Sequence, residues 1–231
     1  MSAILSYELD GNPQYDFVQA NDITLKQQEK FRREFLSNIS HEFKTPLFAI
    51  QGYIEALQEG NVNDPVMSQK FLDKAAKNVD RLSILIKDLD SISKLESGEI
   101  TINYEKFDLA ELIKEVFESL ELKAERYKIS LIFKEKYNYP TWVRADREKI
   151  RQVFVNLLDN SFKYGKENGT TSVKTFELHN QILIEITDDG IGIEEKYLPR
   201  LFERFYRTDK SRSRQIGGSG LGLAIVKHIV E

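Results

Sequence analysis

The sequence predicts a helical hairpin followed by a mixed α/β domain, that is, an α plus α/β fold. Three observations carry this prediction: apolar residues recur at alternating steps of three and four in the first half, a segment rich in Gly, Asn and Pro interrupts them, and strand and helix patterns alternate from about residue 107. The 231 residues give room for one large domain or two modest ones. We expect three regions, 1–24, 25–98 and 107–231.

Composition excludes several classes of function. The formal net charge of −4 argues against a general binder of nucleic acid or of anionic membranes, which normally carries a basic excess. Because the chain has no cysteine, disulfides, thiol catalysis and cysteine-based zinc sites are excluded. No run approaches the ~18 apolar residues of a membrane-spanning helix, and Met1–Gly11 lacks the features of a secretion signal. We therefore expect a soluble, cytoplasmic chain.

The second region, 25–98, predicts two amphipathic helices joined at Gly60–Pro65. Apolar residues in each helix keep the spacing of a coiled-coil seam, and others widen the second seam. Two such wide faces cannot cover each other fully, so we expect a homodimer in which two hairpins form a four-helix bundle. The seam residues are Leu36, Ile39, Phe43, Pro46, Ile50, Tyr53 and Leu57, then Phe71, Ala75, Leu82, Leu85, Leu89 and Ile92, with Leu72, Val79, Ile86 and Leu95 beside them.

The third region, 107–231, predicts an α/β sandwich. Apolar periodicity indicates helices at 109–127, 146–164 and 221–230, the second of them capped by Asp146. Short apolar runs indicate strands at 129–134, 142–144, 171–178 and 182–187, the last two paired across His179 and Asn180.

His41 lies between two seam positions, Ile39 and Phe43, and should therefore face solvent. A lone exposed histidine is usually a solvated surface residue. Pro46, however, stands inside the helix at a cost of ~3 kcal/mol, which a purely structural bundle has little reason to accept. The string Phe35–Leu47 resembles the phosphoacceptor motif of histidine kinases: a His, an acid, any two residues, Thr or Asn, then Pro-Leu.

This resemblance implies that His41 accepts the γ-phosphoryl group of ATP, a task that suits an imidazole because its ring offers a nucleophilic nitrogen. Glu42 would orient and deprotonate the imidazole as a general base. Thr45 lies one turn after His41 on nearly the same face. In the family, the matching residue holds the water that dephosphorylates a partner protein; a hydrogen bond from Thr45 back to the His41 carbonyl is the alternative.

A second motif lies on the helix that begins at Asp146. Its polar stripe, Asn156, Asn160, Lys163 and Tyr164, matches the asparagine motif of the same family. The resemblance implies that Asn160 binds Mg²⁺, that Asn156 and Lys163 contact phosphates, and that Tyr164 covers the base. From spacing alone, an ordinary amphipathic helix with a wet side remains the alternative.

Two glycine motifs follow. In the first, Asp188 would accept a hydrogen bond from the adenine amino group, while Gly190 and Gly192 would let the backbone approach closely. The second opens the last helix, where bare N–H groups and the helix N-terminus would bind phosphates. A flexible linker is the alternative for each motif alone. The phosphate-contacting residues expected in the second motif are Gly218, Gly220, Leu221 and Gly222.

Between the glycine motifs, Leu201–Arg207 resembles the family's phenylalanine motif. Arg204 and Arg207 would neutralise phosphate charge from a mobile lid, and a solvated basic loop is the competing interpretation.

Together the motifs resemble the sensor histidine kinases of two-component systems from about Phe31 to Glu231, with Asn38–Glu42 and Leu95–Gly98 most like the phosphate-regulon type. The resemblance implies ATP and Mg²⁺ as cofactors, and a response regulator receiver domain and a second copy as partners. The native protein would then be anchored in a membrane upstream. Residues 1–24 would be a remnant of a PAS sensor domain or a leader. The alternatives are a DNA-repair or chaperone ATPase with the same nucleotide fold, or a degenerate dimeric scaffold.

Overall fold

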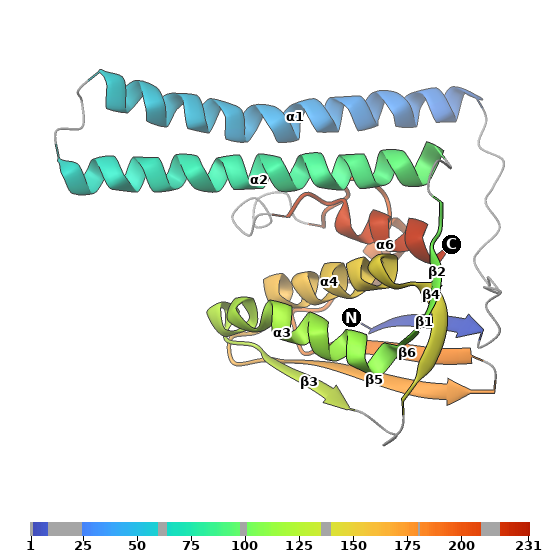
Figure 1. Cartoon of the computed structure of the whole chain (residues 1–231). Coiled ribbons are helices and arrows are strands. Elements are labelled where there is room, and N and C mark those ends of the chain that lie inside the picture. The colour runs from blue at the N-terminus through green and yellow to red at the C-terminus, as the bar shows by residue number, and fades with distance from the viewer. Residues whose placement is uncertain are drawn as a thin grey trace. The chain divides into compact units, whose positions relative to one another are not determined.

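A computed structural model describes residues 2–8, 25–59, 64–97, 101–134, 140–179, 181–208 and 218–231 (Figure 1). The chain divides into two compact units. We call Val18–Ser93 with Arg204–Leu221 the hairpin unit, and Met1–Phe17, Lys94–Glu203 and Gly222–Glu231 the sheet unit. Among the described residues, no helix combines the length and the apolar character that crossing a membrane requires.

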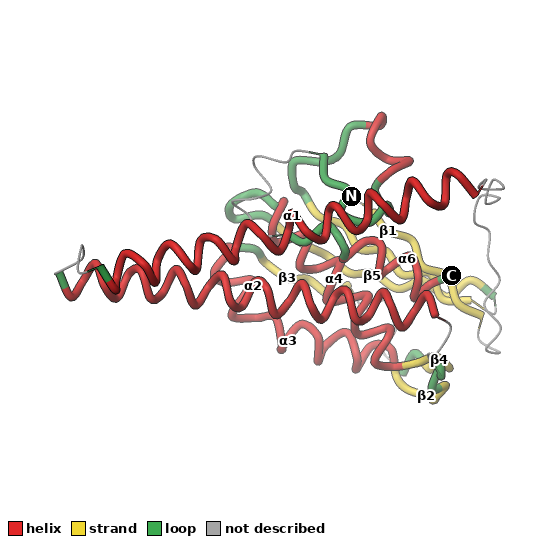
Figure 2. Tube along the Cα trace, turned by 90° about the horizontal axis from the view of Figure 1, so that it is seen from above, coloured by secondary structure: helices red, strands yellow, loops and turns green. Residues whose placement is uncertain are grey.

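Two long helices dominate the hairpin unit. Helix α1 (Leu25–Gln58) and helix α2 (Pro65–Ser97) run side by side in both ribbon views (Figures 1 and 2). Helix α2 begins where Asp64 Oδ1 accepts a hydrogen bond from the Val66 N–H at 3.0 Å, and Pro65 suits the first helical position because its missing N–H would have no partner there.

The apolar faces of α1 and α2 are only partly covered within one chain. Of the predicted seam, Pro46, Ala75, Leu85 and Ile92 are buried, whereas Leu36 is exposed. Of the residues that widen the second seam, Leu95 is half-buried, whereas Leu72, Val79 and Ile86 remain 51%, 49% and 54% exposed. The hairpin therefore leaves an apolar stripe without a partner inside the described chain.

Among its described residues, the sheet unit contains two sheets and three α-helices. The larger sheet has the strand order β1-β6-β5-β3, in which β3 pairs in parallel with β5 and the other pairs are antiparallel. Strands β2 and β4 form a separate antiparallel pair. The bounds are β1 Ser2–Glu8, β2 Tyr104–Asp108, α3 Leu109–Tyr127, β3 Ser130–Lys134, β4 Trp142–Asp146, α4 Arg147–Tyr164, β5 Thr170–Leu178, β6 Gln181–Asp188, the 3-10 helix η1 Glu195–Arg200 and α6 Gly222–Val230.

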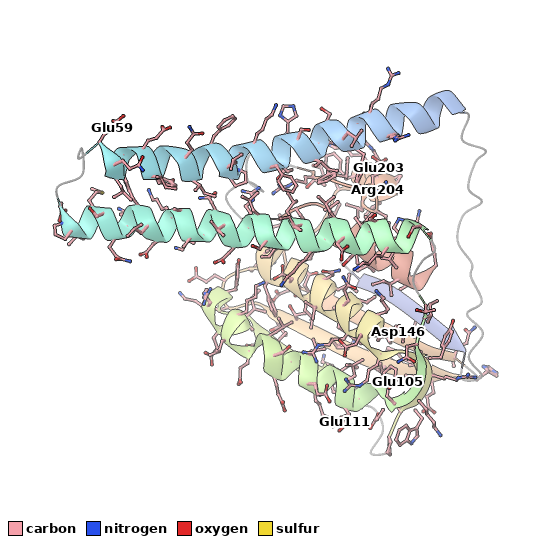
Figure 3. The ribbon with its side chains drawn as sticks, turned by 45° about the horizontal axis from the view of Figure 1, so that its top comes forward. Glu59, Glu105, Glu111, Asp146, Glu203 and Arg204 are labelled. Carbon is pink, nitrogen blue, oxygen red and sulfur yellow. The ribbon has the colours of Figure 1, made fainter. Side chains whose placement is uncertain are left out.

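Local side-chain caps set the beginnings of α3 and α4. Asp108 accepts hydrogen bonds from the N–H groups of Ala110 and Thr141, at 3.0 Å and 2.9 Å. Asp146, labelled in Figure 3 where α4 begins, accepts one from the Lys149 N–H at 3.0 Å, so the predicted cap is confirmed.

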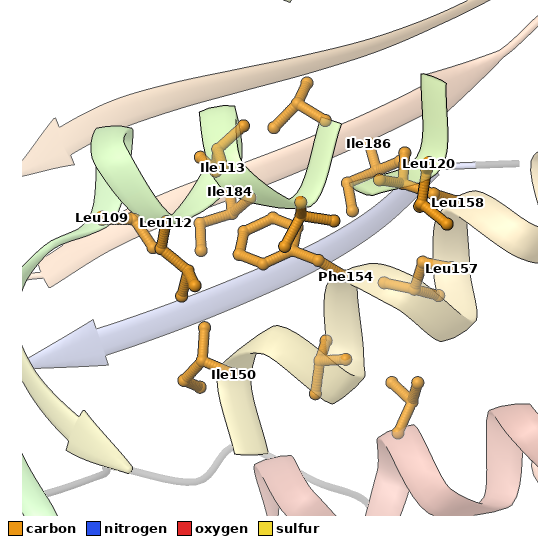
Figure 4. Packing of buried hydrophobic residues seen from close by; sticks show 14 of the residues in the cluster. Leu109, Leu112, Ile113, Leu120, Ile150, Phe154, Leu157, Leu158, Ile184 and Ile186 are labelled. Carbon is orange, nitrogen blue, oxygen red and sulfur yellow. The ribbon is translucent and has the colours of Figure 1, made fainter. Parts of the chain in front are cut away.

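One hydrophobic core holds the sheet unit together. The apolar faces of α3 and α4 meet residues of β6 in a single cluster (Figure 4). Phe154 of α4 is completely buried in it, and Val226 of α6 closes one side. This packing fixes the polar side of α4, because the helix cannot rotate without exposing its core residues.

Most elements match the prediction, with three differences. The helices and strands expected from 109 onward are present within a few residues of their expected ends. Strand β2 and the helix η1 were not anticipated. The third difference lies in the first expected region, 1–24, where β1 forms and pairs with β6; residues 9–24 lie outside the described residues.

Candidate active site

His41 is exposed on α1, as predicted, while the adjacent Glu42 is half-buried and turned toward α2. The Arg81 guanidinium on α2 donates a hydrogen bond from Nη2 to Glu42 Oε2 at 3.0 Å. In the same unit, Arg207 Nη1 lies 3.9 Å from Glu42 Oε1. The carboxylate beside the candidate phosphoacceptor is therefore held in one direction by cations rather than left mobile.

Sequence reasoning missed Arg81, although one signal could have found it. Glu42 stands 20 residues before Val62 in the predicted break, and Arg81 stands 19 residues after it. In an antiparallel hairpin, positions at equal distances from the turn lie opposite each other. A charge of opposite sign at the mirrored position therefore indicates an interhelical pair.

The Thr45 hydroxyl occupies the position that the alternative interpretation expects. Its Oγ1 donates to the His41 carbonyl oxygen at 3.2 Å, on the exposed side of α1. This bond uses the single hydroxyl proton, but a hydroxyl oxygen keeps lone pairs that can accept a hydrogen bond from water. The geometry is thus compatible with both interpretations of Thr45.

Helix α4 presents the predicted polar stripe at its half-buried edge, because its neighbours Leu157 and Leu158 point into the core. Asn156 Nδ2 donates to the Gly222 carbonyl oxygen at 3.4 Å. This hydrogen bond brings the asparagine motif and the beginning of α6 together. Within the described part of the chain, the Asn160 amide makes no side-chain hydrogen bond, so its oxygen is available to a ligand.

Lys163 is engaged within its own helix. Its ammonium lies 2.6 Å from Asp159 Oδ2, and Lys123 of α3 contacts Asp159 Oδ1. Burial, the largest single influence, raises the pKa of Asp159, but the charges and hydrogen bonds of Lys163 and Lys123 together outweigh it and lower that pKa. Asp159 is therefore ionised at neutral pH, and sequence reasoning did not anticipate this cluster.

The ends of β6 and α4 are fastened to each other at the first glycine motif. Asp188 Oδ1 accepts from the Gly190 N–H at 2.9 Å, and the Ile191 N–H donates to the Tyr164 carbonyl at 3.1 Å. A Cβ on Gly190 would lie 2.5 Å from the Tyr164 oxygen, so only glycine fits. The structure thereby brings the end of α4, at Tyr164, beside the end of β6, at Asp188.

Gly192 differs from Gly190. It adopts the left-handed φ of 69°, and a Cβ there would meet nothing within 4 Å. Its conformation favours glycine, and the space beside it fits the close approach expected of a bound nucleotide.

Segments 204–208 and 218–221 belong to the hairpin unit. The Phe205 N–H donates to the Gly220 carbonyl at 2.9 Å, and a Cβ on Gly220 would lie 2.9 Å from the Phe205 Cα. The Arg204 guanidinium carbon lies 5.1 Å from the ring centre of Phe35, and Ser219 Oγ donates to Asp88 Oδ2 at 2.8 Å. Arg204 and Arg207, predicted to face phosphates, thus contact residues of α1.

The donor set near Asn160 suits Mg²⁺ carried by a triphosphate. No group of three His, Asp or Glu residues that could hold a metal ion occurs among the described residues. A dedicated all-protein metal site is not needed, because Mg²⁺ keeps several waters and takes other ligands from phosphates. One half-buried amide oxygen, such as that of Asn160, is enough for such an arrangement.

Comparison with known proteins decides the family. Residues 31–98 match the family described as "His Kinase A (phospho-acceptor) domain", and residues 145–231 match "Histidine kinase-, DNA gyrase B-, and HSP90-like ATPase". A "Sensor protein kinase WalK" of Staphylococcus aureus is 38% identical over 214 residues, which are 91% of this chain and 51% of that relative. The chain belongs to the sensor histidine kinases.

Solved structures of histidine kinases share the fold. The histidine kinase AdeS of Acinetobacter baumannii is 28% identical, with a TM-score of 0.65 over 82% of this chain and 85% of that chain. Full-length ShkA, described in complex with AMPPNP, is 26% identical, with a TM-score of 0.61 over 85% of this chain and 40% of that chain. The chain spans about half the length of the first curated relative that it matches, and 35% of others.

Proposed function

We propose that this kinase core phosphorylates itself on His41 with ATP and passes the phosphoryl group to an aspartate of a response regulator receiver domain. The observation that carries the proposal is an exposed histidine whose neighbouring carboxylate is held in place by Arg81. The same chain carries the half-buried polar stripe of α4, in which Asn156 is hydrogen-bonded to Gly222 of the second glycine motif. A surface histidine without function would need neither feature.

In the proposed first step, one ring nitrogen of His41 attacks the γ-phosphorus while the bond from that phosphorus to the bridging oxygen breaks, and ADP leaves. Glu42 orients the ring and takes up the proton that the phosphorylated imidazole releases. Its carboxylate already has a fixed direction, because Arg81 holds Oε2 at 3.0 Å. Fixing the base in advance lowers the ordering cost of the reaction.

The nucleotide would lie between the polar stripe of α4 and the first glycine motif. Asp188 would accept a hydrogen bond from the adenine amino group, and Tyr164 would cover the base. Asn156 and Lys163 would contact phosphates, and Asn160 would hold Mg²⁺, which neutralises charge on the phosphates. Support comes from the 3.1 Å hydrogen bond between Ile191 and Tyr164, which sets the position of Asp188 beside the end of α4.

The glycine motif at the beginning of α6 would complete the phosphate site. Gly222 lies beside Asn156, and a Cβ there would still be 3.8 Å from the Asn156 side chain. Gly218, Gly220 and Leu221 would offer backbone N–H groups to the phosphates, and Arg204 and Arg207 would add positive charge. The AMPPNP named for ShkA is consistent with a triphosphate ligand in this family.

The proposed partners are a second copy of the chain and a receiver domain. The uncovered stripe at Leu72, Val79 and Ile86 would be buried in a dimeric four-helix bundle. His41 is exposed on α1, so its phosphorylated form would be open to a docking receiver domain. Thr45 on the same face would support removal of the phosphoryl group from the receiver. We place this reaction in the cytoplasm, where ATP and receiver domains occur.

A nucleotide fold shared with other ATPases would explain α4 and the glycine motifs but not His41. The family matched by residues 31–98 is a phosphoacceptor family, and the matched residues include His41 and all of α2. A degenerate scaffold would not need to keep Asn160, Asp188 and His41 together. We therefore prefer a working kinase to either alternative.

The test is incubation with γ-labelled ATP. Wild-type protein should acquire acid-labile, base-stable label, the signature of a phosphoramidate, and His41→Gln should acquire none while still binding ATP and forming dimers. His179→Asn is the control, because His179 is also exposed and its φ of 56° suits asparagine. Acid-labile label that persists in His41→Gln, or is lost in His179→Asn, contradicts the assignment of His41.

A further inference from the structure

Asp159 lies on α4 between the two asparagines of the motif and binds two lysines from different helices. Lys163, four residues later on α4, lies 2.6 Å from Oδ2. Lys123 reaches Oδ1 from α3. The side chains of Asp159 and Lys163 are 21% and 15% exposed, whereas that of Lys123 is 40% exposed.

This arrangement poses a conflict for Lys163. A half-buried carboxylate that loses its cation suffers an uncompensated desolvation penalty. If Lys163 turns toward a phosphate, Asp159 would be such a carboxylate unless another cation stays with it. Lys123 is that cation, because it binds the other oxygen and comes from a helix outside the motif. Asp159, Lys163 and Lys123 together carry a net charge of +1, so the pair of Asp159 and Lys123 that stays behind when Lys163 leaves is neutral.

We propose that Lys123 is a positioning residue for nucleotide binding, which holds the charge of Asp159 so that Lys163 can move to a phosphate of ATP. The proposal rests on the proposed function, in which Lys163 is a phosphate contact. Asp159 keeps Lys163 extended along α4 before the nucleotide arrives. The ion pair between Lys123 and Asp159 persists while Lys163 changes partner, so the desolvation penalty of an unpaired Asp159 is avoided.

The competing explanation is that Lys123 and Asp159 only clip α3 to α4. The structure already contains such a clip elsewhere on the same two helices: Arg147 Nη2 donates to both carboxylate oxygens of Glu115, at 2.7 Å and 2.6 Å. This pair contacts neither Asp159 nor the asparagine stripe in the described structure. Glu115→Gln therefore loosens the junction between α3 and α4 without touching the proposed exchange, and serves as a matched control.

The first experiment compares Lys123→Met with Glu115→Gln by calorimetric titration with ATP, ADP and adenosine. Losing an interaction with a charged group, here the Asp159 carboxylate, costs about 1.5 kcal/mol. The affinity for ATP should therefore fall about tenfold in Lys123→Met. Adenosine, which has no phosphate for Lys163, should bind as tightly as to wild type. Glu115→Gln should lower the unfolding temperature while leaving the ratio of ATP to adenosine affinity unchanged.

The second experiment places Lys123→Met in an Asp159→Asn background. The amide at position 159 is neutral and needs no cation when Lys163 leaves. Lys123→Met should therefore have no effect on ATP affinity in this background. A tenfold loss that persists in this background overturns the proposal, as does an equal loss of ATP and adenosine binding in Lys123→Met. If wild type binds adenosine but not ATP, or neither, the proposed function fails first. If wild type binds ATP and Lys123→Met binds it with unchanged affinity, the positioning role of Lys123 is rejected and the proposed function is not affected.

Discussion

Replacing Gly190 by alanine should break the joint between β6 and α4. The new Cβ would lie 2.5 Å from the Tyr164 carbonyl oxygen and 2.6 Å from Asp188 Oδ1. One of these atoms belongs to the backbone at the end of a packed helix, and it cannot move without pulling α4. The other belongs to the side chain proposed to recognise adenine.

The magnitude follows from these distances. Non-bonded heavy atoms rest at about 3.5 Å, so the joint must open by about 1 Å. Forcing extra volume into a packed site typically costs about 1–3 kcal/mol. Opening the joint would also weaken the 3.1 Å hydrogen bond from Ile191 to Tyr164, for about 1 kcal/mol more. We expect Gly190→Ala to lower the free energy of unfolding by about 2–4 kcal/mol and to abolish measurable nucleotide binding.

Gly192→Ala is the matched control, two residues along the same motif. It meets no atom within 4 Å, so its only cost in the free protein is the left-handed backbone at φ 69°, about 1–2 kcal/mol. Urea unfolding followed by circular dichroism measures both costs, and calorimetric titration with ATP measures binding. If Gly190→Ala proves as stable as Gly192→Ala and still binds ATP, the reasoning about the joint is wrong.

Four further outcomes are expected. Asn160→Ala should remove Mg²⁺-dependent ATP binding with little change in unfolding temperature, because its amide lies outside the core; unchanged Mg-ATP affinity in calorimetry would exclude it as the metal ligand. Light scattering at micromolar concentration should give twice the chain mass for wild type and less for Val79→Asp, since each seam side chain buried is worth ~1.5–3 kcal/mol; a wild-type monomer contradicts the dimer. Thr45→Ala should keep autophosphorylation but lose dephosphorylation of a phosphorylated cognate receiver, and equal decay with both proteins would refute this. Asp159→Asn should be less stable than wild type at neutral pH, because ion pairing lowers the pKa of Asp159 and so stabilises the fold above about pH 4; the difference in urea unfolding should shrink as the pH falls below that value, and a constant difference would contradict the assignment.

The sequence predicted those parts of the fold that depend on neighbours in the chain. Helix α4 begins at its predicted cap because Asp146 needs only the N–H of Lys149, three residues away. Strands β5 and β6 pair across a short turn, where His179 takes a left-handed φ of 56°. The order of the motifs along the chain also predicted a histidine kinase, and the two family matches confirm that prediction. The phosphate-regulon subgroup, the domain bounds and the individual residue roles stay predictions.

The parts that the sequence did not reveal depend on residues distant in the chain. Strand β2 forms only because it pairs with β4, about 40 positions later by the register of Tyr104 with Asp146. The two glycines of the first motif look alike in sequence. Their environments differ because Gly190 touches Tyr164, a neighbour through folding only. Periodicity reports which face of one helix is buried, but it does not report which residue of another element lies against that face.

The two cations that sequence reasoning missed suit different tasks. Arg81 and Lys123 each bind a carboxylate next to a residue with a proposed role in the chemistry, Glu42 beside His41 and Asp159 beside Asn160. A general base must keep one direction, and the planar guanidinium offers donors in a fixed fork. The cation that stays paired with Asp159 when Lys163 moves needs no fixed direction. An ammonium on a flexible stem meets this need as a point charge. Arg81→Lys should therefore slow autophosphorylation at saturating ATP without weakening ATP binding, whereas Lys123→Arg should leave both nearly unchanged, and single-turnover labelling together with calorimetry separates the two effects. Equal behaviour of the two conservative variants would show that charge alone matters at both positions.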